Sequence, residues 1–207
     1  MTSALGSLDI VSRDGRRVSV RRATRETEIS LSLDLDGTGA ADIETGVGFY
    51  DHLLASFAHH GLIDLTIRAT GDLAVDDHHT VEDVALVLGA GLSEALGDRA
   101  GIVRFGDATV PMDEAVATAI LDVGGRPYAV VDLPFRAERA GALTLQLVEH
   151  ALEAFARTAG ATLHLRGTGR NDHHLAEAAF KALGRALRAA TALDPRRQGL
   201  ASTKGST

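Results

Sequence analysis

The 207-residue chain has no cysteine and no tryptophan, and only two of its 21 basic residues, Lys181 and Lys204, are lysines. Without cysteine it can form no disulfide, no zinc–thiolate site and no cysteine nucleophile. No apolar run approaches the roughly 20 residues that a membrane-spanning helix needs, and Met1–Asp9 does not have the layout of a secretory signal. The net charge of −7 argues against nucleic-acid binding through bulk electrostatics. We therefore expect a globular cytoplasmic protein that binds neither nucleic acid nor membrane.

Histidine is abundant instead, with nine in the chain, and most of them lie in blocks of sequence that occur twice. The matched blocks are 26–37 with 114–125, 51–58 with 149–156, 68–71 with 166–169, and 77–82 with 172–177. Four matched blocks in the same order predict a tandem duplication. We place the first repeat at residues 8–100 and the second at residues 101–195, followed by a polar tail at residues 196–207.

The spacing of apolar residues changes in the same order along each repeat. Alternation typical of half-buried strands is followed by helical spacing of apolar residues, a further strand and a second helix. The predicted segments are strands at 27–35 and 115–123, helices at 49–60 and 143–159, strands at 62–69 and 161–166, and helices at 79–96 and 174–192. Gly61 and Gly160 stand where helix C-caps are expected. This order predicts a duplicated α+β fold, in which each half is a strand-rich sheet with two helices covering one face.

Each repeat also carries three histidines and one glutamate in a pattern typical of a metal site. The first set is His52, His78, His79 and Glu82, and the second is His150, His173, His174 and Glu177. Spacings of three and four place imidazole and carboxylate on one helical face. Nitrogen and carboxylate ligands without sulfur suit Mn²⁺, Fe²⁺ or Zn²⁺, of which we favour Mn²⁺. One such motif is weak evidence, because a lone helical histidine is usually structural, but two matched copies favour metal binding.

Four other residues lie in or near these motifs, and three of them have two interpretations each. Asp77 and Asp172 precede the histidine pairs, where they would cap the following helix or orient an imidazole. His60 precedes Gly61 and would either approach substrate or stabilise a helix C-terminus, the simpler interpretation. We expect His164, in an alternating strand, to be structural.

Motifs with chemically functional residues extend from Arg22 to Gly205. They are Arg22-x-Thr24-x-Glu26-Thr27-x-Ile29, Gly48-Phe49-x-Asp51-His52-x-Leu54, Asp77-His78-His79-Thr80-Val81-Glu82-Asp83, Arg104-Phe105-Gly106, Gly125-Arg126-Pro127, Asn171-Asp172-His173-His174-x-x-Glu177-x-x-Phe180-Lys181 and Ser202-Thr203-Lys204-Gly205. Together they resemble the imidazoleglycerol-phosphate dehydratase family of histidine biosynthesis. The chain is too short for the phosphatase domain fused to some members, so it resembles the monofunctional form.

The resemblance implies a fold, an assembly and a reaction. Each half would have the ribosomal-protein-S5-domain-2-like fold, and 24 subunits would form a homo-oligomer with active sites between subunits and two Mn²⁺ ions in each. The reaction is that of a hydro-lyase, which removes water from D-erythro-imidazoleglycerol phosphate to give imidazole acetol phosphate. A metal on the ring would favour the imidazolate, which expels the hydroxyl to give a diazafulvene-like intermediate. The residues leave open which histidine joins which glutamate, and from which subunit.

The resemblance also assigns residues to the substrate. Glu26 becomes the candidate acid/base, although spacing alone would make it a surface carboxylate or an ion-pair partner of Arg22 or Arg25. The residues that match the family's contacts to the substrate phosphate are Arg104, Arg126, Lys181, Ser202 and Lys204. Arginine, lysine and serine supply the bidentate, point-charge and hydroxyl donors that a phosphate requires.

Two other functions fit the same residues. A dinuclear metal hydrolase of a small phosphorylated substrate would share the metals and the basic residues. A non-catalytic cage would use the histidine clusters only to join subunits. The basic residues count against the cage, because structural metal sites need no phosphate-binding group.

Overall fold

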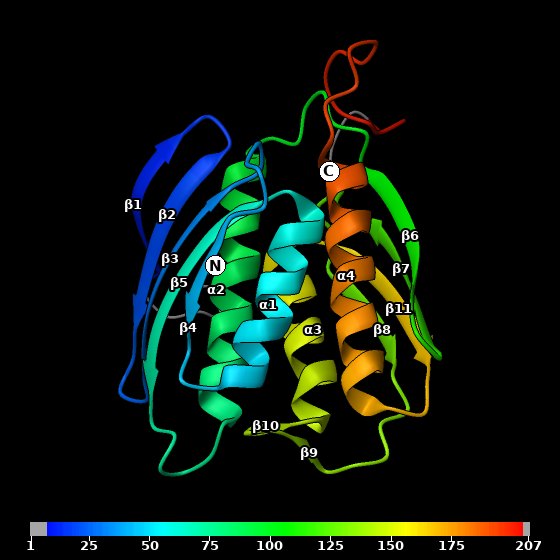
Figure 1. Cartoon of the computed structure of the whole chain (residues 1–207). Helices are drawn as coiled ribbons and strands as arrows, with labels where there is room; N and C mark the ends of the chain where they lie inside the picture. The colour runs from blue at the N-terminus through cyan, green and yellow to red at the C-terminus, as the bar shows by residue number, and fades with distance from the viewer. Residues whose placement is uncertain (1–7, 205–207) are drawn as a thin grey trace.

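Two β-sheets form the outer layers of the molecule and four helices form the layer between them (Figure 1). The computed structural model describes residues 8–204 of the chain. The predicted tail is therefore described only as far as Lys204, and residues 205–207, including Gly205 of the last motif, lie outside the described residues. No helix between residues 8 and 204 is long and apolar enough to cross a membrane.

The first repeat forms a five-stranded sheet and two helices. Its elements are β1 (Leu8–Asp14), β2 (Arg17–Ala23), β3 (Thr27–Asp34), β4 (Ala41–Glu44), α1 (Gly48–Gly61), β5 (Asp64–Gly71) and α2 (His78–Leu96). The strand order is β1-β2-β3-β5-β4. Only β4 and β5 pair in parallel, because α1 connects them and carries the chain back across the sheet.

The second repeat has the same topology without a counterpart of β1. Its elements are β6 (Phe105–Met112), β7 (Ala115–Asp122), β8 (Tyr128–Asp132), β9 (Arg139–Ala140), β10 (Leu143–Thr144), α3 (Gln146–Ala159), β11 (Thr162–Thr168) and α4 (Asp172–Thr191). The sheet order is β6-β7-β11-β8, and β8 pairs in parallel with β11. The prediction that a helix begins at Leu143 is wrong, because Leu143 and Thr144 pair with β9.

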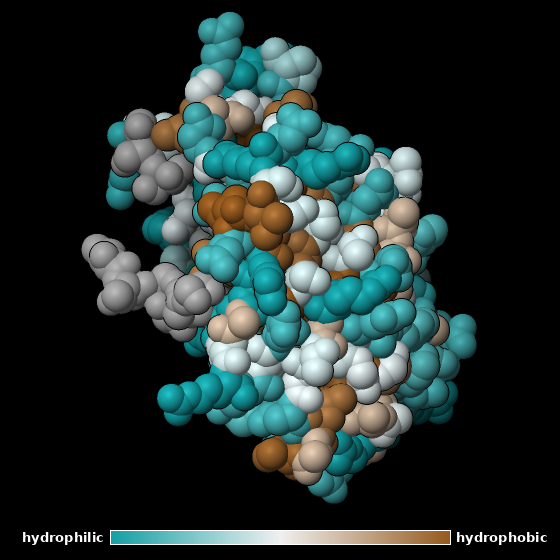
Figure 2. All heavy atoms as spheres, turned by 90° about the vertical axis from the view of Figure 1, so that its left-hand side faces the viewer, coloured by the Kyte–Doolittle hydropathy of each residue, from teal (hydrophilic) through white to brown (hydrophobic). Residues whose placement is uncertain are grey.

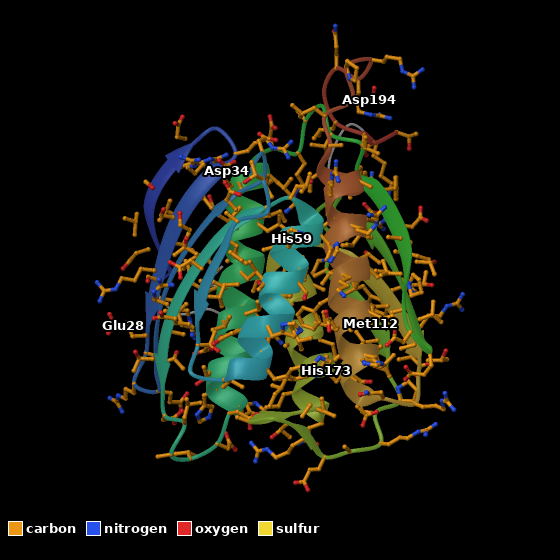
Figure 3. The ribbon with its side chains drawn as sticks, in the orientation of Figure 1. Glu28, Asp34, His59, Met112, His173 and Asp194 are labelled. Carbon is orange, nitrogen blue, oxygen red and sulfur yellow. The ribbon has the colours of Figure 1, made fainter. Side chains whose placement is uncertain are left out.

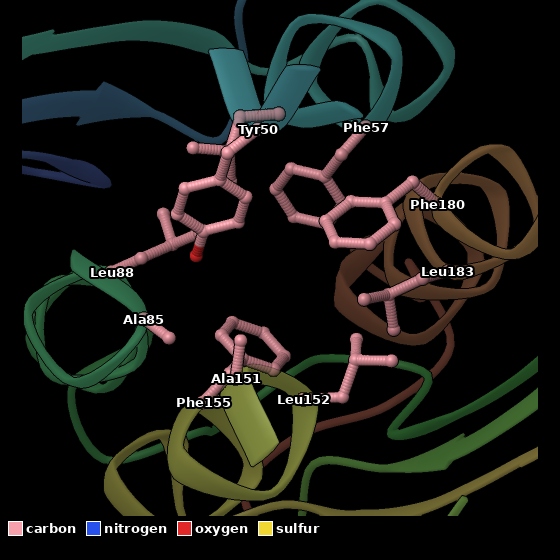
Figure 4. Close-up of a pocket in the computed structure, with 10 residues that line it drawn as sticks. Tyr50, Phe57, Ala85, Leu88, Ala151, Leu152, Phe155, Phe180 and Leu183 are labelled. Atoms are coloured by element: carbon pink, nitrogen blue, oxygen red, sulfur yellow. The ribbon is translucent and has the colours of Figure 1, made fainter. Parts of the chain in front are cut away.

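The helical layer is built from contacts between the two halves. Helix α1 packs against α4, and α2 packs against α3. Tyr50, Phe57, Phe155 and Phe180 meet at the centre, around an apolar cavity of about 20 Å³ (Figure 4). A space of that size holds at most one water molecule, so the interface between the halves is closely packed.

Glycine ends the first helix of each half, but in two different ways. Gly160 has φ = 61° and caps α3 as predicted. Gly61, in contrast, is still helical, and Leu62 takes the left-handed conformation with φ = 52°. A Cβ on Gly61 would lie 3.3 Å from the carbonyl oxygen of Gly184 in α4, which identifies close approach of the two helices as the reason for glycine there. The predicted C-cap at Gly61 is therefore wrong.

The outer faces of the two sheets differ in polarity. On the five-stranded sheet, Arg17 pairs with Asp34 and Arg21 with Glu28 across neighbouring strands, and hydrophilic residues cover much of this side (Figure 2). The four-stranded sheet exposes large apolar side chains on its outer face. They are Phe105, Val116, Ile120, Tyr128 and Val130.

Candidate metal centre and substrate site

Three predicted metal ligands meet where α1 packs against the N-terminal end of α4. Nε2 of His52 and Nε2 of His173 each lie 3.3 Å from Oε2 of Glu177. Figure 3 shows His173 at the lower end of the helical layer. The ring of Phe49 lies 4.7 Å from that of His173 and forms an apolar wall beside the cluster.

A second cluster lies where α3 packs against the N-terminal end of α2. Oε2 of Glu82 is 3.6 Å from Nε2 of His78 and 3.4 Å from Nε2 of His150. The other carboxylate oxygen of Glu82 accepts a hydrogen bond of 3.1 Å from Arg157. The two clusters therefore have the same composition and correspond to each other in the duplicated fold.

Each cluster draws its residues from both halves of the chain. His52 of the first repeat joins His173 and Glu177 of the second, and His150 of the second joins His78 and Glu82 of the first. The sequence left open which histidine joins which glutamate, and in the structure each glutamate lies with one histidine of its own repeat and one of the other. The reason is helix packing, because α1 and α3 each lie against the second helix of the opposite repeat.

The donor atoms of each cluster suit a divalent cation. In each group one atom per residue lies within 4.8 Å of the others, which fits metal–ligand bonds of about 2.0–2.2 Å. Among residues 8–204, the buried Nε2 of His150 has no hydrogen-bond partner of normal geometry and lies 3.4 Å from Oε2 of Glu82, which suits a nitrogen that would bind a metal. Burial alone would raise the pKa of Glu82, but His150 and then Arg157 lower it overall. For Glu177, Lys181 and His52 likewise outweigh burial and lower the pKa, so both carboxylates are ionised at neutral pH.

His79 and His174, the remaining two predicted ligands, belong to neither group of close donors among the described residues. Nδ1 of His79 lies 3.0 Å from Asp72, and Nδ1 of His174 lies 2.9 Å from Glu114. These hydrogen bonds raise the pKa of both histidines. A carboxylate on Nδ1 fixes the ring and directs Nε2 away from it, which is the usual arrangement of a metal-binding histidine.

Glu26 and Glu114 occupy corresponding positions but have different surroundings. Glu114 accepts from Arg170 and Asn171 backbone N–H groups as well as from His174, and these bonds lower its pKa to about 2. The Glu26 carboxylate lies 3.9 Å from Nε2 of His79 and is exposed. Arg22, one of the ion-pair partners considered for Glu26, pairs with Asp83.

Most of the basic residues assigned to phosphate lie far from both clusters. The Arg104 side chain binds Asp122 at 2.7 and 2.9 Å and the carbonyl oxygen of Ala201 at 2.6 Å. Its backbone N–H donates to Ala190 near the end of α4, roughly 25 Å along that helix from His173. Figure 3 shows this separation, with Asp194 and His173 toward opposite ends of the molecule.

Arg126, Ser202 and Lys204 belong to the same end as Arg104. Arg126 is exposed and, together with Arg104, lowers the pKa of Asp122 against the effect of its burial. The Ser202 hydroxyl accepts the backbone N–H of Lys204. Lys181 differs, because its ammonium lies 2.8 Å from Oε1 of Glu177 and so beside a metal cluster. Within one chain, Lys181 therefore lies apart from the other residues assigned to the substrate phosphate.

Asp77 and Asp172 do neither of the things expected of them. Asp77 is buried and accepts hydrogen bonds from the backbone and hydroxyl of Thr144. Asp172 accepts from the backbone N–H groups of Arg136 and Ala137, and Asn171 is the residue that caps α4. The side chains of both aspartates therefore bind the segment between β8 and α3 and do not cap the helix that follows them.

His60 and His164 also have defined surroundings. Burial and then the nearby charge of Lys181 lower the pKa of His60, which weakens the view that a charged His60 stabilises the helix end. His164 is exposed on the outer face of β11 and lines a shallow hollow with Ile120 and Asp132.

Sequence reasoning missed three residues that bind a cluster glutamate or the neighbouring histidines, namely Asp72, Glu114 and Arg157. Glu114 had a signal, because the repeat aligns it with Glu26. Asp72 and Arg157 had none, because no repeated block contains Asp72 and the block that ends at Ala156 stops before Arg157.

Comparisons with known proteins identify the relatives of the chain. A family model described as imidazoleglycerol-phosphate dehydratase matches residues 45–187. A curated protein of that name from Methanoculleus marisnigri is 60% identical over 191 residues, which are 92% of this chain and 99% of that protein. The chloroplastic imidazoleglycerol-phosphate dehydratase 1 of Arabidopsis thaliana is 51% identical over 193 residues, which are 92% of this chain and 72% of that protein.

Two solved structures are similar as well. The crystal structure of imidazoleglycerol-phosphate dehydratase from Staphylococcus aureus has a TM-score of 0.77 and 36% identity, covering 85% of this chain and 98% of that one. The enzyme from Pyrococcus furiosus, crystallised with (S)-C348, has a TM-score of 0.78 and 37% identity, covering 90% and 99%. Sequence and fold therefore point to the same relatives.

Proposed function

The chain belongs to the imidazoleglycerol-phosphate dehydratase family and has its hydro-lyase activity in histidine biosynthesis, and we propose that two metal centres built from both halves support that reaction. The observation that carries the proposal is the pair of corresponding clusters, each with two histidines and one glutamate. A substrate imidazole has two ring nitrogens, so two metal centres match the two positions at which it can be held.

The metal that suits these residues is Mn²⁺, which accepts imidazole and carboxylate ligands and leaves positions open for substrate. His52, His173 and Glu177 would hold one ion, and His78, Glu82 and His150 the other. A divalent ion held by these residues would supply Lewis acidity, which would favour the imidazolate form of a substrate ring. Phe49 stacks near one cluster and would limit access of water to that centre.

Glu26 is the proposed acid/base. It lies beside His79, and among residues 8–204 no hydrogen bond fixes its carboxylate as Glu114 is fixed. The carboxylate would therefore be available to take a proton from the substrate carbon and to return one to a leaving group. General acid–base catalysis of this kind contributes about 100- to 10,000-fold to a rate.

We further propose that His79 and His174 complete the metal centres of neighbouring subunits. Their Nε2 atoms are directed away from the carboxylates that bind Nδ1, which leaves one nitrogen free to reach another chain. This assignment agrees with a cytoplasmic homo-oligomer of 24 S5-domain-2-like subunits with sites between them. It also accounts for Arg104, Arg126, Ser202 and Lys204, which would reach the substrate phosphate from a different subunit than the metal ligands do, whereas Lys181 would reach it beside Glu177.

Mixing two inactive variants tests the shared site. His78→Ala and His79→Ala chains should each be inactive alone and should regain activity when unfolded, mixed and refolded together, because some sites then receive His78 from one chain and His79 from the other. Failure to regain activity, with mixed oligomers shown by mass spectrometry, would contradict the proposal.

Metal removal tests the role of the clusters in the reaction. The Mn²⁺-loaded protein should convert imidazoleglycerol phosphate to the ketone, chelator-treated protein should not, and added Mn²⁺ should restore turnover. Release of inorganic phosphate would instead indicate the hydrolase. Full turnover after complete metal removal would contradict a metal-dependent mechanism.

A further inference from the structure

Three polar side chains are buried together where β2 and β3 pack against α2. Nη1 of Arg22 lies 2.5 Å from Oδ2 of Asp83, and the hydroxyl of Thr27 donates to the same oxygen at 2.5 Å. Arg22, Thr27 and Asp83 are only 8%, 4% and 7% exposed. Asp83 directly follows the cluster residue Glu82 on α2, so the group joins the sheet to the helix that carries a metal centre.

From this group, hydrogen bonds lead to the turn that carries Glu26. The hydroxyl of Thr24 accepts the backbone N–H groups of Glu26 at 3.1 Å and of Thr27 at 3.0 Å. The backbone N–H of Thr24 donates to the carbonyl oxygen of Thr27 at 2.8 Å. Thr27 therefore connects the buried group to a closed turn, and this turn determines where the Glu26 side chain begins.

A second path leads from Glu26 back to α2. The backbone N–H of Asp72 donates to the carbonyl oxygen of Glu26 at 3.1 Å. The Asp72 carboxylate binds Nδ1 of His79, the second residue of α2. The contacts thus begin on α2 at Asp83 and return to α2 at His79, with Glu26 between them.

In the second repeat, the residues that correspond to this buried polar group are apolar. The repeat alignment and the strand register place Val110, Ala115 and Ala178 where the first repeat has Arg22, Thr27 and Asp83. Ala115 and Ala178 are buried, and Val110 packs against the core. Because burying an ion pair seldom adds stability over apolar packing, the fold itself does not require the charged group of the first repeat.

We propose that Arg22, Thr27 and Asp83 are positioning residues that hold Glu26 at a fixed place relative to the metal ligands of α2. This inference rests on the proposed role of Glu26 as the acid/base. The second repeat does not need such a group, because Glu114 is held directly by His174 and two backbone N–H groups. In the first repeat the glutamate is held through the backbone, and the printed contact of its carboxylate among residues 8–204 is the longer one of 3.9 Å to Nε2 of His79.

The test replaces the polar group by the apolar residues of the second repeat. In the full-length Mn²⁺-loaded enzyme, the triple variant R22V/T27A/D83A should lower kcat about 100-fold and change KM less than about threefold, with unchanged metal content and oligomer mass. Two single variants at position 27 provide a second test in case the triple variant does not fold. Thr27→Val should lower kcat about tenfold, and Thr27→Ser, which retains the hydroxyl, should restore it.

Combination with Glu26→Gln separates positioning from a general structural effect. If the group acts through Glu26, adding R22V/T27A/D83A to Glu26→Gln should lower kcat no further, because interacting residues are not additive. Fully additive losses, or equal activity of Thr27→Val and Thr27→Ser, would overturn the inference and leave the proposed function intact. Normal kcat of Glu26→Gln alone would overturn the proposed role of Glu26 itself.

Discussion

The two halves of the chain share one topology but use corresponding carboxylates for different tasks. Glu114 of the second half holds His174 and two backbone N–H groups, so both of its oxygens are committed. Glu26 of the first half is not bonded in this way, because Asp72 holds His79 in its place. The position of Asp72 corresponds to Arg170 in the second half, whose side chain cannot accept a hydrogen bond.

Under the proposed function, this difference would allow a duplicated protein to keep two equivalent metal-binding clusters and still have a single acid/base group. Each cluster consists of two histidines and one glutamate, so the two clusters stay alike. The proton-transfer group is needed once. In the first half Asp72 binds the histidine, so Glu26 does not have to bind it as Glu114 does in the second half.

The largest expected effect separates the two glutamates. Glu26→Gln should lower kcat by about 100- to 10,000-fold while the metal content stays at the wild-type level, because the proposed acid/base is lost and no ligand is. Glu114→Gln is the matched control and should keep a near-normal kcat when metal is saturating. Steady-state kinetics with metal analysis measures both, and equal loss of kcat in the two variants would contradict the division of roles.

Asp72 and Glu114 each bind Nδ1 of a histidine, so substitutions at these two positions should have similar effects on metal affinity. Substitutions at Glu26 and Glu114, in contrast, should have different effects on kcat. Asp72→Asn and Glu114→Gln each weaken the hydrogen bond to Nδ1 of a proposed metal ligand. Changes at such partners typically lower metal affinity by about 10- to 100-fold. Mn²⁺ titration of activity should therefore show a similar shift for both variants. Unchanged titration curves would show that His79 and His174 do not bind metal.

The C-terminal tail gives the next smaller effect. In the first half the counterpart of Arg104 is Arg16, which binds the carbonyl oxygen of Thr191, whereas Arg104 binds Ala201 of the tail. Deleting residues after Leu200 should raise KM at least about tenfold, because each charge-assisted hydrogen bond to the phosphate contributes about 1.5–3 kcal/mol. Thermal unfolding should change little. Unchanged KM would remove Ser202 and Lys204 from the substrate site.

Repetition explains why so much of the fold was predictable. Matched blocks divide the chain, and periodicity within the repeats predicts strands β3, β5, β7 and β11 and the four helices at nearly the same bounds, whereas the other strands were not predicted. Local signals failed where a long-range contact decides the outcome. Leu143 joins a two-residue strand instead of a helix, and Gly61 serves the approach of α4 rather than a left-handed cap.

The candidate site was predictable in its residue types and not in its grouping. His52 and Glu82 belong to one repeat, yet they lie in different clusters because α1 packs against α4 and α2 against α3. Helix partners are set by the packing of whole apolar faces, which sequence spacing does not contain. Asp77 shows the same limit, since its partner Thr144 lies in the other repeat.

The smallest expected effect concerns pH and again contrasts corresponding residues. Asp64 accepts the backbone N–H groups of Thr38, Gly39 and Ala40, and these bonds lower its pKa, those of Thr38 and Ala40 most. At the corresponding place, the neutral hydroxyl of Thr162 donates to the backbone carbonyl oxygen of Arg126. A carboxyl with a lowered pKa stabilises the fold above its unfolded-state pKa near 3.8 and loses that contribution as pH falls through the folded-state value.

Asp64→Asn should therefore cost about 1 kcal/mol at pH 7 and progressively less below pH 4, whereas the cost of Thr162→Val should not vary with pH. Denaturant unfolding at several pH values measures both, and parallel pH profiles for the two variants would contradict the role of the Asp64 charge.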